Sequence, residues 1–159
     1  MDNPREEMKE LVEDIQKVKG LDNLSSKLVA ELFTDPEEVS LNELADRTGY
    51  SLSAVSNKMK RLVDTGFVEK RKKPGSKKIY FYMEKSLIKS LTENVSEMYN
   101  KIIGMIEDRV PEIIERYKEA DDERNCEKEI VERYYKEVRL FDELFQKFIE
   151  KLKEEGKDV

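Results

Sequence analysis

The sequence predicts a mainly α-helical protein with a small β-wing, and three observations support that fold class. Two helical patterns meet at a Gly-Tyr-Ser turn within residues 41–65, and a hairpin pattern with a Pro-Gly tip follows at 67–83. Apolar residues then recur every three or four positions through most of 86–155. Together these patterns predict a winged helix-turn-helix followed by long C-terminal dimerisation helices. The expected boundaries are 1–20 for an N-terminal support or dimerisation helix, 21–84 for the winged helix-turn-helix and 85–159 for the helical arm.

The segment before residue 41 is predicted to form two helices and a short strand. A support helix follows Leu21, and Thr34-Asp35-Pro36 ends it, because the residue before a proline disfavours helical geometry. Val39-Ser40-Leu41 is expected to form a short strand against the wing. The first helix, over residues 4–19, has an apolar side made of Met8, Leu11, Val12, Ile15 and Val18.

Residues 41–65 are predicted to form two helices that cross through a tight turn. Ala45 supplies a small residue where the backbones touch, Gly49 tolerates positive φ in the turn, and Val55 faces back into the crossing. Ser40 and Ser51 are expected to cap the two helices. The remaining residues expected on the apolar side are Leu41, Leu44, Leu52, Met59 and Leu62.

The second of these helices, over residues 51–65, is predicted to turn polar side chains toward solvent. Hydroxyl, amide and cationic groups of this kind read base edges or hold phosphates when a helix lies in the major groove of DNA. The DNA-binding residues expected here are Ser51, Ser53, Ser56, Asn57, Lys58, Lys60 and Arg61.

Gly66 ends that helix, and residues 67–83 are predicted to form a two-stranded basic wing with a turn at Pro74-Gly75. Residues 51–78 carry nine Lys and Arg against Asp64 and Glu69, a net charge of +7, whereas the rest of the chain carries −13. A positive module on a negative body fits binding to a polyanion, although lysines of a hairpin can also be merely solvated. The wing residues expected on the DNA backbone are Arg71, Lys72, Lys73, Lys77 and Lys78.

The motif LADRTGYSLSAVSNKMKRLVDTGFVEKR, followed by GSKKIYFY, resembles winged-helix transcription regulators of the MarR superfamily, and more closely the GbsR-like branch. The resemblance covers residues 22–83 and implies sequence-specific binding to double-stranded DNA. Many members carry Asp-x-Arg in the wing, where the Asp braces an Arg in the minor groove. This chain has Ser76-Lys77-Lys78 there, so we expect its wing to hold phosphates rather than to read groove width.

Composition argues against other functional classes. The chain has no histidine and one cysteine, Cys126, so the usual general base is missing and no disulfide or thiolate metal cluster can form within one chain. Acidic neighbours disfavour a reactive thiolate at Cys126, which we interpret as a surface residue. We expect no cofactor, no metal and no enzymatic activity. Charged residues reach 42%, mostly Lys and Glu, a balance that resembles thermophile surfaces. Without a transmembrane-length apolar run or signal-peptide features, the protein is expected in the cytoplasm.

The final helix carries the spacing of a coiled coil, which favours a dimerisation arm. Pro111 is expected to kink the preceding helix or to restart it near Val110, and the two helices are expected to join near Ala120-Asp121-Asp122. The alternatives are an intrachain hairpin packed on the N-terminal helix, or stripes that line a small-ligand cavity. The expected dimer interface consists of Val131, Tyr134, Val138, Phe141, Phe145, Phe148 and Leu152.

These predictions describe a homodimeric transcription regulator whose recognition helices enter successive major grooves of a pseudo-palindromic site. One alternative is a winged helix used as a protein-interaction module in a larger assembly. A second is binding to RNA or single strands, which is disfavoured because Tyr80 and Tyr82 are expected to serve the core and hairpin instead of stacking on bases. The sequence does not identify a small-molecule effector.

Overall fold

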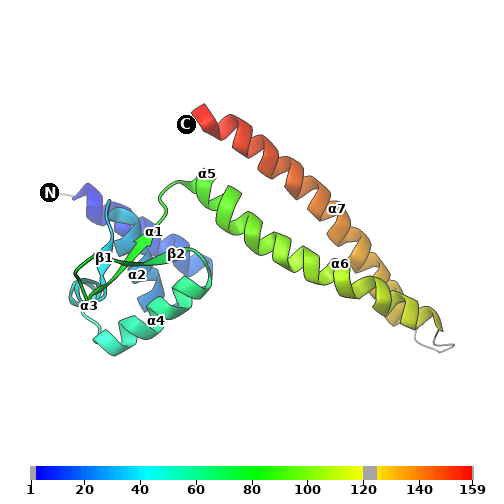
Figure 1. The fold of residues 1–159 in the computed structure, drawn as a ribbon, viewed down its shortest axis with the longest axis horizontal. Helices are drawn as coiled ribbons and strands as arrows, with labels where there is room; N and C mark the ends of the chain where they lie inside the picture. The colour runs from blue at the N-terminus through cyan, green and yellow to red at the C-terminus, as the bar shows by residue number, and fades with distance from the viewer. Residues whose placement is uncertain (1–2, 120–124, 159) are drawn as a thin grey trace. The chain divides into compact units, whose positions relative to one another are not determined.

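The computed structural model describes residues 3–119 and 125–158, and the chain divides into two compact units, Met1–Ser86 and Leu87–Val159. The first unit combines four helices with a three-stranded antiparallel sheet (Figure 1). The described part of the second unit is helical throughout. The predicted fold class, mainly helical with a small β-wing and long C-terminal helices, is therefore confirmed.

Each helix of the first unit begins at a polar residue that caps it. The caps of α1 (Pro4–Val18), α2 (Asn23–Thr34), α3 (Leu41–Thr48) and α4 (Leu52–Asp64) are Asn3, Asp22, Ser40 and Ser51. In every case the cap side chain accepts a hydrogen bond from a backbone N–H of the first turn, which would otherwise lack a partner. Gly49 ends α3 with φ of 73°, and its N–H donates to the Ala45 carbonyl, as the predicted turn requires.

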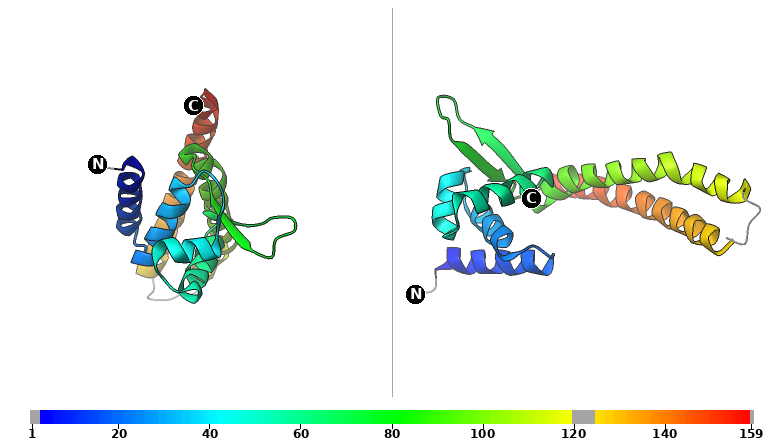
Figure 2. Two further views of the ribbon diagram at one scale, coloured as in Figure 1. Left: turned by 90° about the vertical axis from the view of Figure 1, so that its left-hand side faces the viewer. Right: turned by 90° about the horizontal axis from the view of Figure 1, so that it is seen from below.

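The sheet has the strand order β1-β3-β2, with bounds Val39–Ser40, Ile79–Met83 and Val68–Lys72. Phe81 in the central strand lies opposite Val39 on one side and Lys70 on the other. At the tip, the Ser76 N–H donates to the Lys73 carbonyl over 3.2 Å, and Gly75 has φ of 76°. The β2–β3 hairpin extends away from the helices of its own unit (Figure 2).

The core of the first unit lies where α2, α3 and α4 meet the sheet, and its fully buried side chains include Leu28, Leu32, Val39, Leu44, Val55 and Met59. The prediction that Leu52 faces this core is wrong, because its side chain is 46% exposed. Leu52 is the first residue of α4 and lies at the end of the crossing, which Val55, Met59 and Leu62 already fill.

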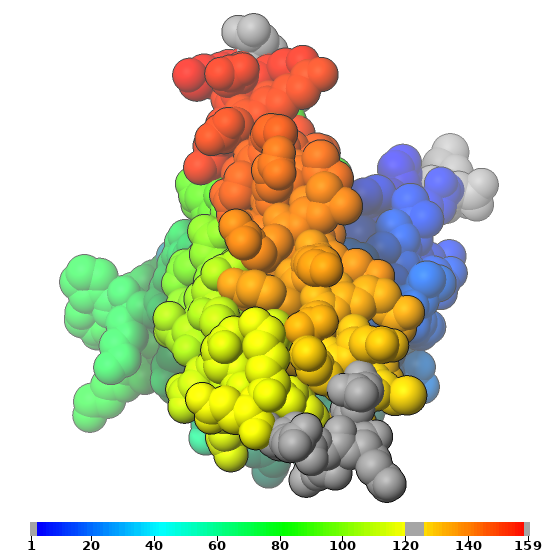
Figure 3. All heavy atoms as spheres, turned by 90° about the vertical axis from the view of Figure 1, so that its right-hand side faces the viewer, coloured from blue at the N-terminus to red at the C-terminus, as the bar shows by residue number. Residues whose placement is uncertain are grey.

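The second unit is an antiparallel helical hairpin, in which α6 (Ser96–Glu119) and α7 (Asn125–Glu155) lie side by side (Figure 3). Its register is marked by hydrogen bonds from Gln146 to Asn100 (2.9 Å) and from Tyr135 to Glu107 (2.8 Å). Before α6 the chain forms the short helix α5 (Leu87–Ser90) and the π-turn η1 (Leu91–Val95), and after α7 the 3-10 turn η2 (Gly156–Asp158).

Helix α6 runs without interruption through Pro111, so the expected fresh start near Val110 does not occur. A proline removes one backbone hydrogen bond, and Pro111 is exposed, so the carbonyl that loses its partner lies on the solvent side of the helix. The expected join near Ala120-Asp121-Asp122 lies outside the described residues. Within residues 3–119 and 125–158, no helix is both long enough and apolar enough to span a membrane.

Candidate nucleic-acid interface

The outer side of α4 presents polar side chains that the fold itself does not use. Val55, Met59 and Leu62 face the core, so the exposed residues lie on the opposite side of the helix. Within the part of the chain that the structure describes, the side chains of these exposed residues make neither a hydrogen bond nor an ion pair. They are therefore available to a ligand, and they comprise Ser53, Ser56, Asn57, Lys60 and Arg61.

Two other residues predicted on this surface already have structural partners. Ser51 caps α4, and its Oγ accepts a hydrogen bond from the Ala54 N–H over 3.2 Å. Lys58 Nζ lies 2.8 Å from Asp22 Oδ2, so it joins α4 to the cap of α2. The hydrogen bond from Lys58 lowers the pKa of Asp22 to about 2, assisted by Ser25 and opposed by partial burial. Lys58 is thus neutralised by a neighbouring carboxylate.

Two of the five predicted wing cations are also paired. Arg71 donates to Glu69 Oε2 from Nε and Nη2, over 3.1 and 2.8 Å, and its guanidinium lies 3.8 Å from the Tyr82 ring centroid. Lys73 Nζ lies 3.2 Å from Glu38 Oε1. The pKa of Glu38 is lowered by a hydrogen bond from its own backbone N–H and by the one from Lys73. The wing is therefore less positive than its sequence indicates.

The other three predicted wing residues remain exposed. Within residues 3–119 and 125–158, Lys72, Lys77 and Lys78 form no ion pair. Ser76 Oγ accepts a hydrogen bond from the Lys78 N–H over 3.1 Å, which fixes the backbone beside the tip. Lys70, which our sequence prediction left out, is equally exposed on β2. The unbroken run of cations at 70–73 in the sequence could have identified it.

Tyr80 and Tyr82 lie on the face of the sheet opposite to the core. Phe81 between them is buried, whereas both tyrosines are half-buried and have cations over their rings. Lys73 Nζ is 4.5 Å from the Tyr80 centroid, and Lys85 Nζ is 3.9 Å from the Tyr82 centroid. The expectation that the tyrosines serve the hairpin is confirmed, and the expectation that they serve the core is wrong, because alternation turns them to the other face.

An ion-pair network connects α3 of the helix-turn-helix to the two preceding helices, α1 and α2. Glu31 on α2 lies 2.9 Å from Lys9 on α1 and 3.4 Å from Arg47 on α3. Asp35 lies 2.8 Å from Arg47 and 3.2 Å from Arg5. Partial burial acts to raise the pKa of Asp35, but the hydrogen bonds from Arg47 and from the Glu37 N–H outweigh it, and that pKa is lowered. The network joins α1, α2 and α3.

The predicted interface residues on α7 are divided between α6 and solvent. Val131, Val138, Phe145 and Leu152 are half-buried, whereas Tyr134, Phe141 and Phe148 are exposed. The Tyr99 ring of α6 lies 5.4 Å from the Phe141 ring and 4.7 Å from the Phe145 ring, between centroids. Part of the stripe therefore holds the hairpin together, and part remains uncovered.

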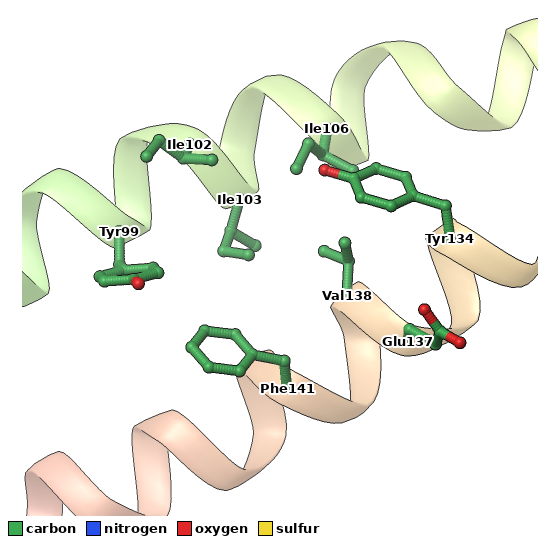
Figure 4. A pocket seen from close by; sticks show the side chains of 8 residues that line it. All are labelled: Tyr99, Ile102, Ile103, Ile106, Tyr134, Glu137, Val138 and Phe141. Carbon is green, nitrogen blue, oxygen red and sulfur yellow. The ribbon is translucent and has the colours of Figure 1, made fainter. Parts of the chain in front are cut away.

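An open, mainly apolar cleft of about 270 Å³ lies between α6 and α7. Figure 4 shows aliphatic side chains of α6 on one side and Tyr134, Val138 and Phe141 of α7 on the other. The carboxylate of Glu137 supplies the charged group at its edge. The lining residues are Tyr99, Ile102, Ile103, Ile106, Tyr134, Glu137, Val138 and Phe141.

The order of α3, α4, β2 and β3, with a polar face on α4 and a basic hairpin, is the arrangement that the sequence motif predicted. Residues 28–79 match the MarR family. The MarR-family segment begins within α2 and ends at the first residue of β3, so it contains the whole helix-turn-helix. The resemblance to the MarR superfamily is thus supported over this segment, while the GbsR-like branch stays a prediction.

The whole chain has a structural neighbour as well. A crystal structure described as a transcriptional regulator is similar with a TM-score of 0.73. The similarity covers 96% of this chain and 99% of the other at 16% sequence identity. At that identity the likeness concerns the fold alone. No curated protein matches the sequence.

Proposed function

We propose that the protein is a transcription regulator of the MarR superfamily, of the GbsR-like type, which binds specific sites in double-stranded DNA as a homodimer in the cytoplasm. The observation that carries this proposal is that the exposed polar side chains of α4, and three lysines of the wing, form no ion pair with any residue that the structure describes. Both lie in the MarR-family segment or at its boundary.

In this proposal α4 enters the major groove and the wing follows the DNA backbone. Ser53, Ser56 and Asn57 supply hydroxyl and amide groups, which can read base edges, while Lys60 and Arg61 can also hold phosphates. The exposed lysines of the wing contact flanking phosphates, which orient the protein without reading sequence. The binding free energy should therefore combine a sequence-specific contribution from α4 with a salt-dependent contribution from the cations.

The hairpin supports a homodimer because eleven of its described large apolar side chains are exposed. Among its described residues, the buried apolar side chains are Ile114 and Ile149. Monomeric proteins rarely expose large contiguous apolar patches, and a second copy can cover these side chains by forming a four-helix bundle. The exposed large apolar side chains of the second unit are Leu87, Met98, Ile102, Met105, Ile113, Ile130, Tyr134, Leu140, Phe141, Leu144 and Phe148.

The length of α7 agrees with such an arrangement. Its 31 residues span about 46 Å at 1.5 Å per residue. Two half-sites one helical turn of DNA apart are separated by about 34 Å, so the arm is long enough to set that spacing. A regulator of this type performs no chemistry on DNA, and we propose that the protein is not an enzyme. A chain without histidine also lacks the commonest general base.

The proposal is tested by selecting a preferred site from a random duplex pool and comparing three ligands at 0.15 M salt, a concentration at which bulk screening is substantial. The ligands are the selected duplex, its separate strands and an RNA of the same sequence. We expect tight binding to the selected duplex alone and sedimentation of the free protein as a dimer. Equal affinity for all three ligands would exclude specific duplex recognition. A particle of 18.8 kDa at micromolar concentration would exclude the dimer.

A further inference from the structure

Large apolar side chains are exposed at few places on the first unit once α1 is set aside. Within the described part of Met1–Ser86 they are Tyr50, Leu52 and Phe67, which are 40%, 46% and 37% exposed. Tyr50 and Leu52 flank Ser51, the cap of α4. Two of the three thus lie at the N-terminal end of the helix that we propose to read DNA.

Leu52 does not contribute to the packing of the core. Helix α4 contributes Val55, Met59 and Leu62 to the buried cluster, and Ala54 and Val63 pack against it, whereas Leu52 does not. An isolated exposed leucine is common on protein surfaces. Here, however, Leu52 lies one helical turn before the exposed Ser56, so a leucine is part of the exposed side of α4 itself.

The first turn of a recognition helix is the part that contacts base edges in the major groove. Base edges there present hydrogen-bond donors and acceptors, and thymine also presents a 5-methyl group that apolar side chains contact. A leucine at this position cannot donate or accept a hydrogen bond. The thymine methyl group is the feature of the groove that matches it.

We propose that Leu52 contacts the 5-methyl group of one thymine in each half-site, with Tyr50 on the other side of Ser51 completing the apolar surface. The inference rests on the proposed function, because it requires α4 to lie in the major groove. It makes Leu52 a specificity-determining residue that acts by apolar contact, beside hydroxyl and amide groups that act by hydrogen bonding.

The experiment uses the full chain and the duplex obtained by site selection, in which each thymine is replaced singly by deoxyuridine. This exchange removes only the methyl group. With the wild-type protein we expect one thymine in each half-site at which the exchange raises Kd about fourfold, the factor for burial of one methyl-sized group. Replacing both thymines should raise Kd about sixteenfold, because distant sites add.

Leu52→Ala should weaken binding to the thymine site by a similar factor and should no longer distinguish thymine from deoxyuridine. Leu52→Met should keep the distinction, since it keeps an apolar side chain of similar volume. Phe67→Ala is the matched control, because it removes an exposed apolar side chain that lies beyond the C-terminal end of α4, and it should leave the distinction unchanged. Thermal unfolding should show the same midpoint for Leu52→Ala as for the wild type, since Leu52 lies outside the core.

Three results separate the inference from the function on which it rests. Failure to select any duplex sequence would overturn the proposed function. A selected site without a methyl-sensitive thymine would overturn the role of Leu52 and leave the proposed function intact. A methyl-sensitive thymine whose effect persists in Leu52→Ala would assign that contact to another residue, and would likewise overturn the inference.

Discussion

Replacing Asp22 by asparagine should strengthen DNA binding, although the substituted residue is the cap of α2 and not part of α4. Asp22 caps α2 by accepting hydrogen bonds from the Ser25 N–H and Oγ, over 3.1 and 2.9 Å, and it also holds Lys58 at 2.8 Å. Asparagine caps a helix about as well as aspartate but carries no charge. Asp22→Asn should therefore keep the helix start and release Lys58 toward the phosphates.

The expected gain follows from counterion release. One additional phosphate contact steepens the slope of log K against log salt by about 0.9, or by about 1.8 for a dimer. If that contact contributes nothing at about 1 M salt, the same slope corresponds to about fivefold tighter binding per subunit at roughly 0.15 M. The cost to folding is small, because the Asp22 and Lys58 side chains are 50% and 29% exposed and a pair of this kind stabilises by about 0.5 kcal/mol.

The assay is fluorescence anisotropy of a labelled duplex between about 0.05 and 0.3 M salt, a range in which screening changes strongly. Asp64→Asn is the matched control, since it removes the same charge from the end of α4. Asp64 forms no ion pair with any residue that the structure describes. An unchanged slope in Asp22→Asn, or an equal increase in both variants, would refute the idea that Asp22 restrains Lys58.

The remaining predictions concern the other parts of the proposed interface and the stability of the fold. Replacing Lys77 and Lys78 by Gln should flatten the salt slope by about 1.8 per subunit, and an unchanged slope would show that they are only solvated. Asn57→Ala should reduce the binding free energy by about 1–3 kcal/mol on the selected site and by little on random duplex, whereas equal losses on both would exclude base reading. Phe141→Glu should convert the dimer into a monomer in sedimentation, and loss of helicity without a change in mass would indicate an intrachain role instead. Since the folded-state pKa of Asp22 is about 2, below its unfolded value, its ionisation stabilises the fold above pH 4, and this contribution is lost as the pH falls from about 4 to 2. Thermal unfolding of the wild type and of Asp22→Asn should therefore converge over that range, and parallel curves would contradict the assignment.

Features that depend on neighbours along the chain were predictable from the sequence. The caps at Ser40 and Ser51, the turn at Gly49 and the bounds of α4 all follow from residues within four positions of one another. Leu52 was misplaced because a helical period assigns a side to each residue but does not say where the neighbouring helix ends.

Features that depend on distant pairs were not predictable. Asp22 and Lys58 are 36 positions apart, and Glu38 meets Lys73 across the sheet. Because 42% of the residues are charged, the sequence offers many possible carboxylate partners for each lysine, and only the folded geometry shows which partner is used. The stripe on α7 was ambiguous for another reason, since helices in one chain and in two chains pack with the same period.

Because the core of the α6–α7 hairpin is small, the fraction of chains with a folded arm should depend on the concentration of the protein. With Ile114 and Ile149 as its buried apolar residues, the described hairpin would gain further cover from a second copy in the proposed dimer, so that association would stabilise it by mass action. At low abundance the concentration of dimers rises with the square of the concentration of chains, and unpartnered chains expose surfaces that proteases and chaperones recognise. Occupancy of a DNA site would then rise steeply above a threshold of expression, with no ligand needed to produce that response.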